Sequence, residues 1–206
     1  MTTPDATVFR SAAFYMAVGK AFTLMAMVVP ALAMIELLNQ VWHGTVSEWL
    51  GIRVGDRLAI FRFYTAPFLH FGWDHLRINS SAIIILGTFA LAGGMGRFLG
   101  STAIIATASG FGVWFFTPPG TLVVGASGVI FGWMGLLILR GLLEHTWWHL
   151  AVVIVVGLLY GWQLTNSMVS TDPSIAWQGH VGGFVGGLFA AFVLRRTPPK
   201  PKDEKK

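Results

Sequence analysis

The stretch Gly125-Ala126-Ser127-Gly128 opens the fourth of six apolar runs in this chain, and it decides the fold together with a second stretch, Trp177-Gln178-Gly179-His180-Val181-Gly182-Gly183, which opens the sixth. The first stretch places a hydroxyl group between glycines where a helix begins. The second places an imidazole beside glycines at a similar point. This pattern indicates a fold that brings Ser127 and His180 together inside a bilayer.

The composition around these two stretches is that of a membrane protein. Hydrophobic residues make up 54% of the chain and charged residues only 11%, whereas a soluble domain averages about 25% charged residues. The chain has room for several membrane helices and for no second soluble domain. We therefore expect an all-α, polytopic membrane protein built as a bundle of six transmembrane helices.

The boundaries of the expected elements follow from the apolar runs. We expect a short cytoplasmic tail at residues 1–17, a six-span core at 18–195 and a basic cytoplasmic tail at 196–206. A long first loop, at about residues 39–73, has room for short interfacial helices. The six expected spans cover about residues 18–38, 74–92, 97–116, 126–139, 150–164 and 177–194.

Lysine and arginine indicate the orientation. With both termini in the cytoplasm, that side holds Arg10, Lys20, Arg97, Arg140 and the basic C-terminal tail, while the other side holds Arg53, Arg57, Arg62 and Arg77. This asymmetry agrees with the excess of positive charge in cytoplasmic segments, so we expect both termini in the cytoplasm. We expect a multi-pass protein of the plasma membrane, because the sequence shows no obvious transit peptide. Because the basic residues gather in the tails, the net charge of +5 does not indicate nucleic-acid binding.

This orientation places four polar side chains at one depth. The second, fourth and sixth spans enter from the outer face, and their first turns carry His75 and Asn79, Ser127, and His180, respectively. Polar groups within spans are costly and usually functional. Taken alone, Ser127 would more often be a helix cap and His180 a packed polar residue. Their matched depth favours catalysis.

The chemistry these residues could perform is acyl transfer. A serine hydroxyl becomes a nucleophile when a base takes its proton, and histidine is the usual base. No Asp or Glu is expected at the same depth, so we predict a Ser127–His180 dyad and not a triad. Helices approach closely through small residues, and the two glycine faces expected to meet are Gly128, Gly132, Gly135 and Gly179, Gly183, Gly186.

Acyl transfer also needs donors for the oxyanion. His75 and Asn79 are four residues apart and share a helix face, and both side chains can donate hydrogen bonds. The Ser127 backbone N–H at a helix start is a third donor. His70 lies in the approach to the second span, where we expect it to support the loop structurally.

With these residues, the chain resembles the rhomboid family of intramembrane serine proteases from about residue 18 to 195. The matching stretches are His70-Phe71-Gly72-Trp73-Asp74-His75-Leu76-Arg77-Ile78-Asn79, Gly125-Ala126-Ser127-Gly128 and Gly179-His180-Val181-Gly182-Gly183-Phe184-Val185-Gly186-Gly187. The resemblance implies a six-span rhomboid-like bundle, Ser127 as nucleophile, His180 as general base, and His75 with Asn79 binding the oxyanion. It also implies single-span transmembrane proteins as substrates, cut in or just outside the membrane at a small residue, without a cofactor.

The chain departs from the family pattern at three places. Phe61-Arg62 stands where the family often has Trp-Arg, and Phe131 stands where a Tyr often stacks on the catalytic histidine. Gly96-Arg97 occupies the region where a Glu often follows the second span, so we expect a loop-to-helix tether to be missing there. The glycines beside the serine, Gly125 and Gly128, are retained.

Two other classes of function stay open at this stage. A non-catalytic protein of the same fold that binds client helices would share the glycine faces. A metal enzyme or transporter could use His70, His75 and His180, or the pair His145 and His149. The chain has no cysteine and no HExxH motif, so no metal or cofactor is predicted. The sequence leaves open the oligomeric state and the way the loops and the fifth span admit substrate.

Overall fold

The computed structural model describes residues 6–57, 59–144, 149–155, 157–158, 166 and 175–195. These residues are mostly helical, as predicted. Of the expected fifth span, at about residues 150–164, residues 156 and 159–164 lie outside the described residues, as does the whole C-terminal tail at 196–206. The elements are α1 (Ala6–Val41), α2 (Thr45–Leu50), β1 (Ile52–Arg53), α3 (Ala59–Arg62), the 3-10 helix η1 (Ala66–Phe68), α4 (Trp73–Ala92), α5 (Met95–Phe116), β2 (Leu122–Val123), α6 (Ser127–Leu143) and α8 (Trp177–Val193).

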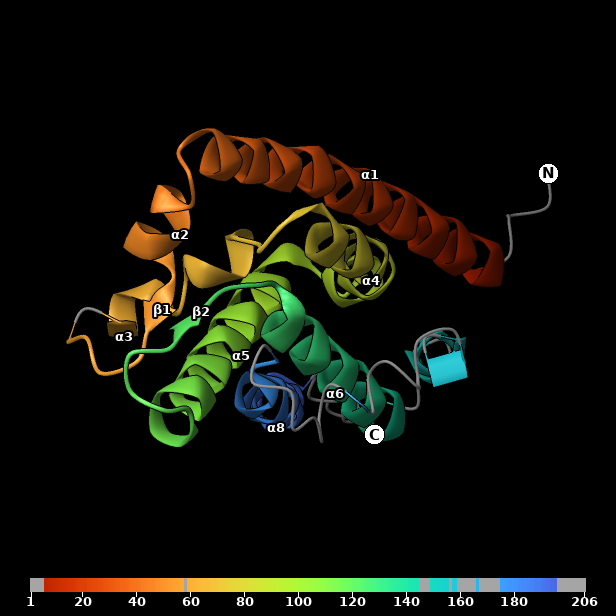
Figure 1. Cartoon of the computed structure of the whole chain (residues 1–206). Helices are drawn as coiled ribbons and strands as arrows, with labels where there is room; N and C mark the ends of the chain where they lie inside the picture. The colour runs from red at the N-terminus through yellow and green to blue at the C-terminus, as the bar shows by residue number, and fades with distance from the viewer. Residues whose placement is uncertain are drawn as a thin grey trace.

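The long helices pack as a bundle with α1 on one side (Figure 1). α8 packs mainly against α5 and α6, whereas α1 packs mainly against α4. α4 also packs against α6, so the two halves share one apolar core. The side chains fully buried in this core include Leu86, Ile105, Leu136, Leu137 and Ala190.

Three of the described helices are long and apolar enough to cross a membrane: residues 12–41 of α1, α4 and α5. α6 is a shorter apolar helix of 17 residues. Large apolar side chains also point away from the core, for example Phe22, Met27 and Met34 of α1. An apolar exterior of this kind is suited to contact with lipid.

The first helix differs from the prediction. A tail was expected at residues 1–17 and a span at 18–38, but α1 is one helix of 36 residues from Ala6 to Val41. The predicted tail is rich in alanine and other good helix formers, so it continues the helix. Pro30 lies inside α1 without ending it, as membrane helices allow.

The first loop is more ordered than the all-α prediction implied. β1 and β2 pair antiparallel, with Ile52 opposite Val123 and Arg53 opposite Leu122. This small sheet joins the first loop to the segment that leads into α6. A strand of two residues is too short to show the alternation of apolar and polar residues by which strands are recognised, so the sequence did not predict these strands.

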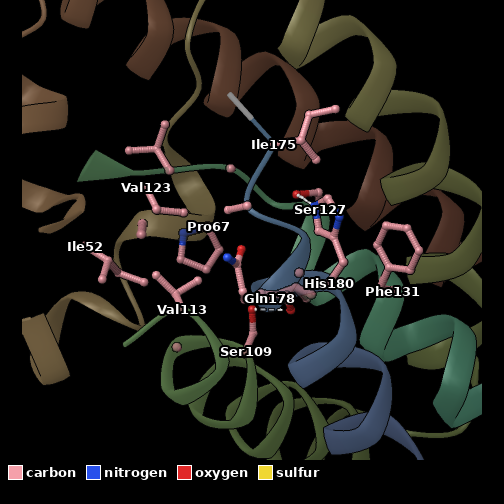
Figure 2. A pocket seen from close by; sticks show the side chains of 18 of the residues that line it. Ile52, Pro67, Ser109, Val113, Val123, Ser127, Phe131, Ile175, Gln178 and His180 are labelled. Atoms are coloured by element: carbon pink, nitrogen blue, oxygen red, sulfur yellow. Dashed lines mark hydrogen bonds between the residues drawn. The ribbon is translucent and has the colours of Figure 1, made fainter. Parts of the chain in front are cut away.

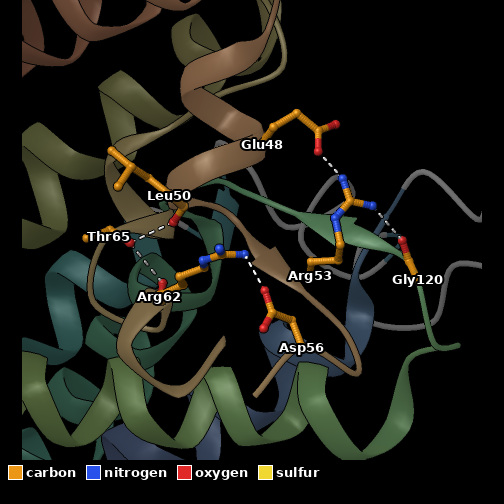
Figure 3. Close-up of polar contacts among 7 residues, drawn as sticks. All are labelled: Glu48, Leu50, Arg53, Asp56, Arg62, Thr65 and Gly120. Carbon is orange, nitrogen blue, oxygen red and sulfur yellow. Dashed lines mark hydrogen bonds and ion pairs between the residues drawn. The ribbon is translucent and has the colours of Figure 1, made fainter. Parts of the chain in front are cut away.

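Polar contacts hold the first loop in place (Figure 3). Arg53 pairs with Glu48 and donates a hydrogen bond of 3.2 Å to the Gly120 carbonyl. Arg62, the arginine retained in the family pattern, pairs with Asp56 at 3.0 Å. The Thr65 hydroxyl donates to the Leu50 carbonyl at 2.6 Å. The loop therefore forms a fixed wall beside the start of α6.

Glycine contacts explain how closely α8 approaches its neighbours. A methyl group on Gly183 or Gly187 would overlap the carbonyl oxygen of Gly128 or Gly132 in α6. A methyl group on Gly182 or Gly186 would instead come within 2.6 Å of Ala108 in α5.

The sequence prediction for this interface was therefore partly wrong. Gly186 faces α5 and not α6, and a methyl group on Gly179 would lie 2.9 Å from Val113 of α5. The reason is the helical spacing of these residues. One face of α8 carries Gly179, Gly182 and Gly186, and the adjacent face carries Gly183 and Gly187. α8 consequently uses two glycine faces and lies between two helices.

Polar contacts join the start of α5 to the ends of α6 and α8, and the end of α6 lies at the other end of this helix from Ser127. The Arg97 guanidinium donates a hydrogen bond of 2.9 Å to the Leu194 carbonyl at the end of α8. It also pairs with Glu144 at the end of α6. The expectation that a tether would be missing in this region was wrong, because Arg97 itself supplies one.

Replacing Arg97 with methionine should destabilise the protein. The pair with Glu144 is mostly buried, with 19% and 14% of the two side chains exposed, and breaking such a pair leaves an uncompensated charge. We expect a loss of about 2 kcal/mol, seen as a Tm lower by several degrees in detergent. Arg195→Met is the matched control at the same end of the bundle and should change Tm little. Equal Tm values for the two variants would contradict the role of the tether.

Candidate active site

Ser127 is the first residue of α6, and a glycine with positive φ shapes the loop before it. Gly125 has φ +125°, a region that side chains rarely adopt. Its N–H donates to the Ala66 carbonyl at 3.0 Å, which fixes the loop before the serine. A methyl group on Gly125 would lie 2.7 Å from Cε1 of His75. Gly125 therefore allows both the turn and the close packing of His75.

Ser127 and His180 meet across the interface of α6 and α8. The Ser127 Oγ and the His180 Nε2 are 2.8 Å apart, a hydrogen-bond distance. The Phe131 ring stacks on the His180 ring with centroids 4.6 Å apart and planes 19° apart. Figure 2 shows the two side chains pointing toward each other, with Phe131 beside the imidazole. His180 is buried, and the close glycine packing at Gly128 and Gly183 makes this approach possible.

His75 and Asn79 lie on α4, on the same cavity as Ser127 and His180. Asn79 is buried, and its side-chain Nδ2 has no hydrogen-bond partner among the described residues. The His75 Nδ1 accepts a long hydrogen bond of 3.5 Å from the Phe71 N–H. The other ring nitrogen, Nε2, would lie 3.0 Å from a methyl group on Gly125. Thus all four residues predicted for catalysis are brought to one place.

His70 lies next to this group but off the cavity. It is fully buried, and neither ring nitrogen has a hydrogen-bond partner among the described residues. Its ring packs edge-on against His75, with centroids 5.1 Å apart. Burial, with a smaller effect of His75, lowers the pKa of His70 from 6.5 to about 4. A neutral, packed His70 fits the structural role expected for it.

The buried His70 should make the fold sensitive to acid. Between pH 6.5 and about 4, unfolded chains bind a proton on this histidine and the folded protein does not, so stability falls as the pH falls through this window. His70→Phe removes the titrating group, and we expect its Tm to fall less between pH 7 and pH 4.5. The same slope in wild type and His70→Phe would contradict the prediction.

The cavity at the dyad is large and mostly apolar. It has a volume of about 900 Å³ and reaches from the start of α4 to the first loop and the start of α8. Its lining includes the apolar side chains Ile52, Phe63, Pro67, Val113 and Ile130. Such a cavity can hold an extended segment of a peptide with apolar side chains.

Three polar residues near the site were missed by the sequence analysis. The Ser109 hydroxyl donates to the Gly179 carbonyl at 2.9 Å, and the Gln178 amide donates to the Phe116 carbonyl at 2.9 Å, so both fix the start of α8. Glu36 of α1 is buried and accepts a hydrogen bond of 3.0 Å from the Gly72 N–H at the start of α4. A buried acidic side chain therefore lies beside the start of α4, and the sequence analysis did not identify it. A lone Glu within an apolar run was the signal that could have found it.

The alternative of a metal centre finds no ligand set in the described part of the chain. No three His, Asp or Glu side chains among these residues are placed to hold one ion. His145 lies outside the described residues, so the pair His145 and His149 is not described together.

The arrangement defines a class: a helical membrane protein with a serine hydroxyl and an imidazole in contact at the start of two helices. Comparison with known proteins gives the family. The model of the Rhomboid domain matches residues 57–197, and the chain therefore belongs to the rhomboid family.

The similar curated proteins include one that is uncharacterized and two that are named rhomboid proteases. The uncharacterized protein Rv1337 of Mycobacterium tuberculosis is 33% identical over 181 residues, which are 84% of this chain and 75% of that protein. The rhomboid protease GluP of Bacillus subtilis is 32% identical over 65% of this chain and 26% of its own length. The rhomboid protease GlpG of Pectobacterium atrosepticum is 28% identical over 86% of this chain and 65% of its own length.

Proposed function

We propose that this protein is an intramembrane serine endopeptidase that uses Ser127 and His180 as a catalytic dyad. The observation that carries the proposal is the 2.8 Å contact between Ser127 Oγ and His180 Nε2, at the wall of a cavity of about 900 Å³. Membership of the rhomboid family, and relatives named as rhomboid proteases, support the same reaction.

The proposed reaction begins with a proton transfer. His180 Nε2 accepts the proton of Ser127 as Oγ attacks the carbonyl carbon of the scissile peptide bond. The imidazolium then gives this proton to the leaving amine, and the acyl group stays on Ser127. Water, activated by the same imidazole, hydrolyses the ester. Phe131 holds the imidazole plane through the stacking contact.

The oxyanion of each tetrahedral intermediate needs donors. Asn79 offers a buried Nδ2 that has no partner among the described residues, and the Ser127 N–H lies at a helix start, where backbone N–H groups are unpaired. His75 adds a ring N–H if its Nε2 carries the proton, which fits the acceptor role of its Nδ1 toward Phe71. Losing one such donor typically lowers kcat about a hundredfold or more.

Helix lengths support a site below the membrane surface. α6 and α8 have 17 residues each, which is about 25 Å of helix, while the hydrocarbon core is about 30 Å thick. If both helices end at the inner boundary, Ser127 and His180 lie a few ångströms below the outer one. α1, with 36 residues, is about 54 Å long and extends well beyond the bilayer.

These lengths fit the topology that we propose. Six spans within residues 18–195 cross a plasma membrane, and residues 1–17 and 196–206 lie in the cytoplasm. The cavity then faces the outer side of the membrane. Substrates are single-span transmembrane proteins whose helix ends near this depth, because an unwound segment exposes its peptide bonds to Ser127. No cofactor takes part.

The test is cleavage of a labelled single-span substrate by the purified protein in liposomes. We expect cleavage near the outer end of a substrate that carries small and helix-breaking residues there, slower cleavage of a matched substrate with leucines in their place, and no effect of a chelator. A folded protein that cleaves neither substrate would favour a client-binding protein without catalysis. Loss of activity with the chelator would favour the metal-dependent alternative.

A further inference from the structure

Glu36 lies on α1, away from the proposed dyad, and its carboxylate is buried with 1% of the residue exposed. Its Oε1 accepts two hydrogen bonds, one of 3.0 Å from the Gly72 N–H and one of 2.9 Å from the Gln40 side-chain amide. Its Oε2 is buried and has no partner among the described residues. A buried carboxylate with one unpaired oxygen is costly, which indicates that the groups it binds have a role.

The backbone that Glu36 binds is the turn that sets His75. Gly72 is the N-cap residue of α4, with φ +90°, and no side chain of α4 caps this helix start. In the preceding peptide, the Phe71 N–H points at Nδ1 of His75. Two successive backbone N–H groups of this turn thus donate to different side chains, that of Phe71 to His75 and that of Gly72 to Glu36.

The hydrogen bond to Nδ1 matters for the oxyanion. When Nδ1 accepts a hydrogen bond, the proton of a neutral imidazole sits on Nε2. The Nε2 of His75 is the ring nitrogen beside Gly125, on the cavity that Ser127 shares. A shift of the turn at Phe71 and Gly72 would release Nδ1 and allow the ring to turn its N–H away.

We propose that Glu36 is a positioning residue for the oxyanion site, because its carboxylate holds the Phe71–Gly72 turn that keeps His75 Nε2–H aimed at the reacting carbonyl. This inference rests on the proposed protease function. Gln40 supports the same end of α4 at a second point, since its Oε1 accepts a hydrogen bond of 3.2 Å from the Trp73 indole. Among the described residues, Gln40 forms side-chain hydrogen bonds with Glu36 and Trp73 and not with the Phe71 or Gly72 peptide, and this difference provides the matched control.

The experiment compares three substitutions of Glu36 with one of Gln40 in the liposome assay. Glu36→Gln keeps an acceptor oxygen for Gly72. Glu36→Met keeps the volume of the side chain but has no oxygen to accept from the Gly72 N–H. Glu36→Asp keeps a carboxylate, but its side chain is one methylene shorter, so the oxygens lie farther from Gly72. Gln40→Met removes the Trp73 contact and one of the two hydrogen bonds to Glu36 Oε1, but leaves the Glu36 carboxylate in place to accept from the Gly72 N–H. For each variant kcat and KM are measured per folded protein, and Tm is measured in the same lipid.

We expect Glu36→Met and Glu36→Asp to lower kcat about tenfold or more, the range of a weakened oxyanion donor, with KM within about twofold of wild type. Glu36→Gln should recover most of the wild-type kcat, and Gln40→Met should keep kcat while lowering Tm. If Glu36→Met does not fold, Glu36→Asp carries the test.

A wild-type kcat in folded Glu36→Met or Glu36→Asp would overturn the proposal, as would a loss of kcat in Gln40→Met equal to theirs. The proposed function would survive either result, because wild type would still cleave in a Ser127-dependent manner. Failure of wild type itself to cleave would instead refute the function.

Discussion

Replacing either Ser127 or His180 with alanine should lower cleavage of a single-span substrate by at least about a thousandfold. In a dyad the two residues act as one unit, so loss of either removes the activated nucleophile. The double variant should then be no slower than the single ones. Additive losses, or a residual rate near that of wild type, would contradict the dyad. The measurement is single-turnover cleavage in liposomes, with folding checked by Tm.

The control for these variants is Ser80→Ala. The Ser80 hydroxyl donates a hydrogen bond of 2.7 Å to the Leu76 carbonyl within α4, so it has a local role. We expect this variant to keep the wild-type rate within about twofold. A thousandfold loss in Ser80→Ala as well would show that the assay reports general damage to the bundle and not the loss of a nucleophile.

The second large effect is expected at the interface between α6 and α8. A methyl group on Gly183 would overlap the Gly128 carbonyl oxygen, which belongs to the backbone and cannot turn aside. Gly183→Ala should therefore push α8 away from α6 and separate the Ser127 hydroxyl from the His180 ring. We expect a loss of activity of about a hundredfold or more, because displacements of about 1 Å can have effects of that size.

Gly183→Ala should also lower the Tm, by an amount typical of overpacking at about 1–3 kcal/mol. The matched control is Gly96→Ala in α5, where a methyl group would meet nothing within 4 Å. Alanine favours a helix over glycine by about 1 kcal/mol, so this control should keep or raise the Tm. Wild-type activity and Tm in Gly183→Ala would mean that the close approach of the two helices is not needed.

The sequence predicted the site better than its surroundings. Ser127 and His180 could be paired because each stands at the start of an apolar run and beside glycines. In the structure, each lies in the first turn of its helix, and the glycines lie at the contact between the two helices. His75 and Asn79 were found through their helical spacing. The direction of Gly186 was mispredicted because a glycine-rich helix has two small faces, and the sequence does not tell which neighbour meets which face.

Other features needed the folded chain. Glu36 is 36 residues away in sequence from Gly72, so only the packing of α1 on α4 brings them together. The sheet of β1 and β2 also joins distant segments, and each of its strands has two residues. The early start of α1 at Ala6 was missed because polar residues in the first turns resemble a tail, although the alanines between them favour a helix.

The most direct test of the central claim is mass spectrometry of the protein after reaction with a fluorophosphonate, whose phosphorus forms a phosphonate ester with an activated serine as fluoride leaves. We expect one adduct, on the peptide that contains Ser127, in wild type and a strongly reduced adduct in His180→Ala. An unlabelled Ser127 in folded wild type, or equal labelling of Ser127 with and without the His180 imidazole, would contradict the claim that these two side chains form the reactive centre.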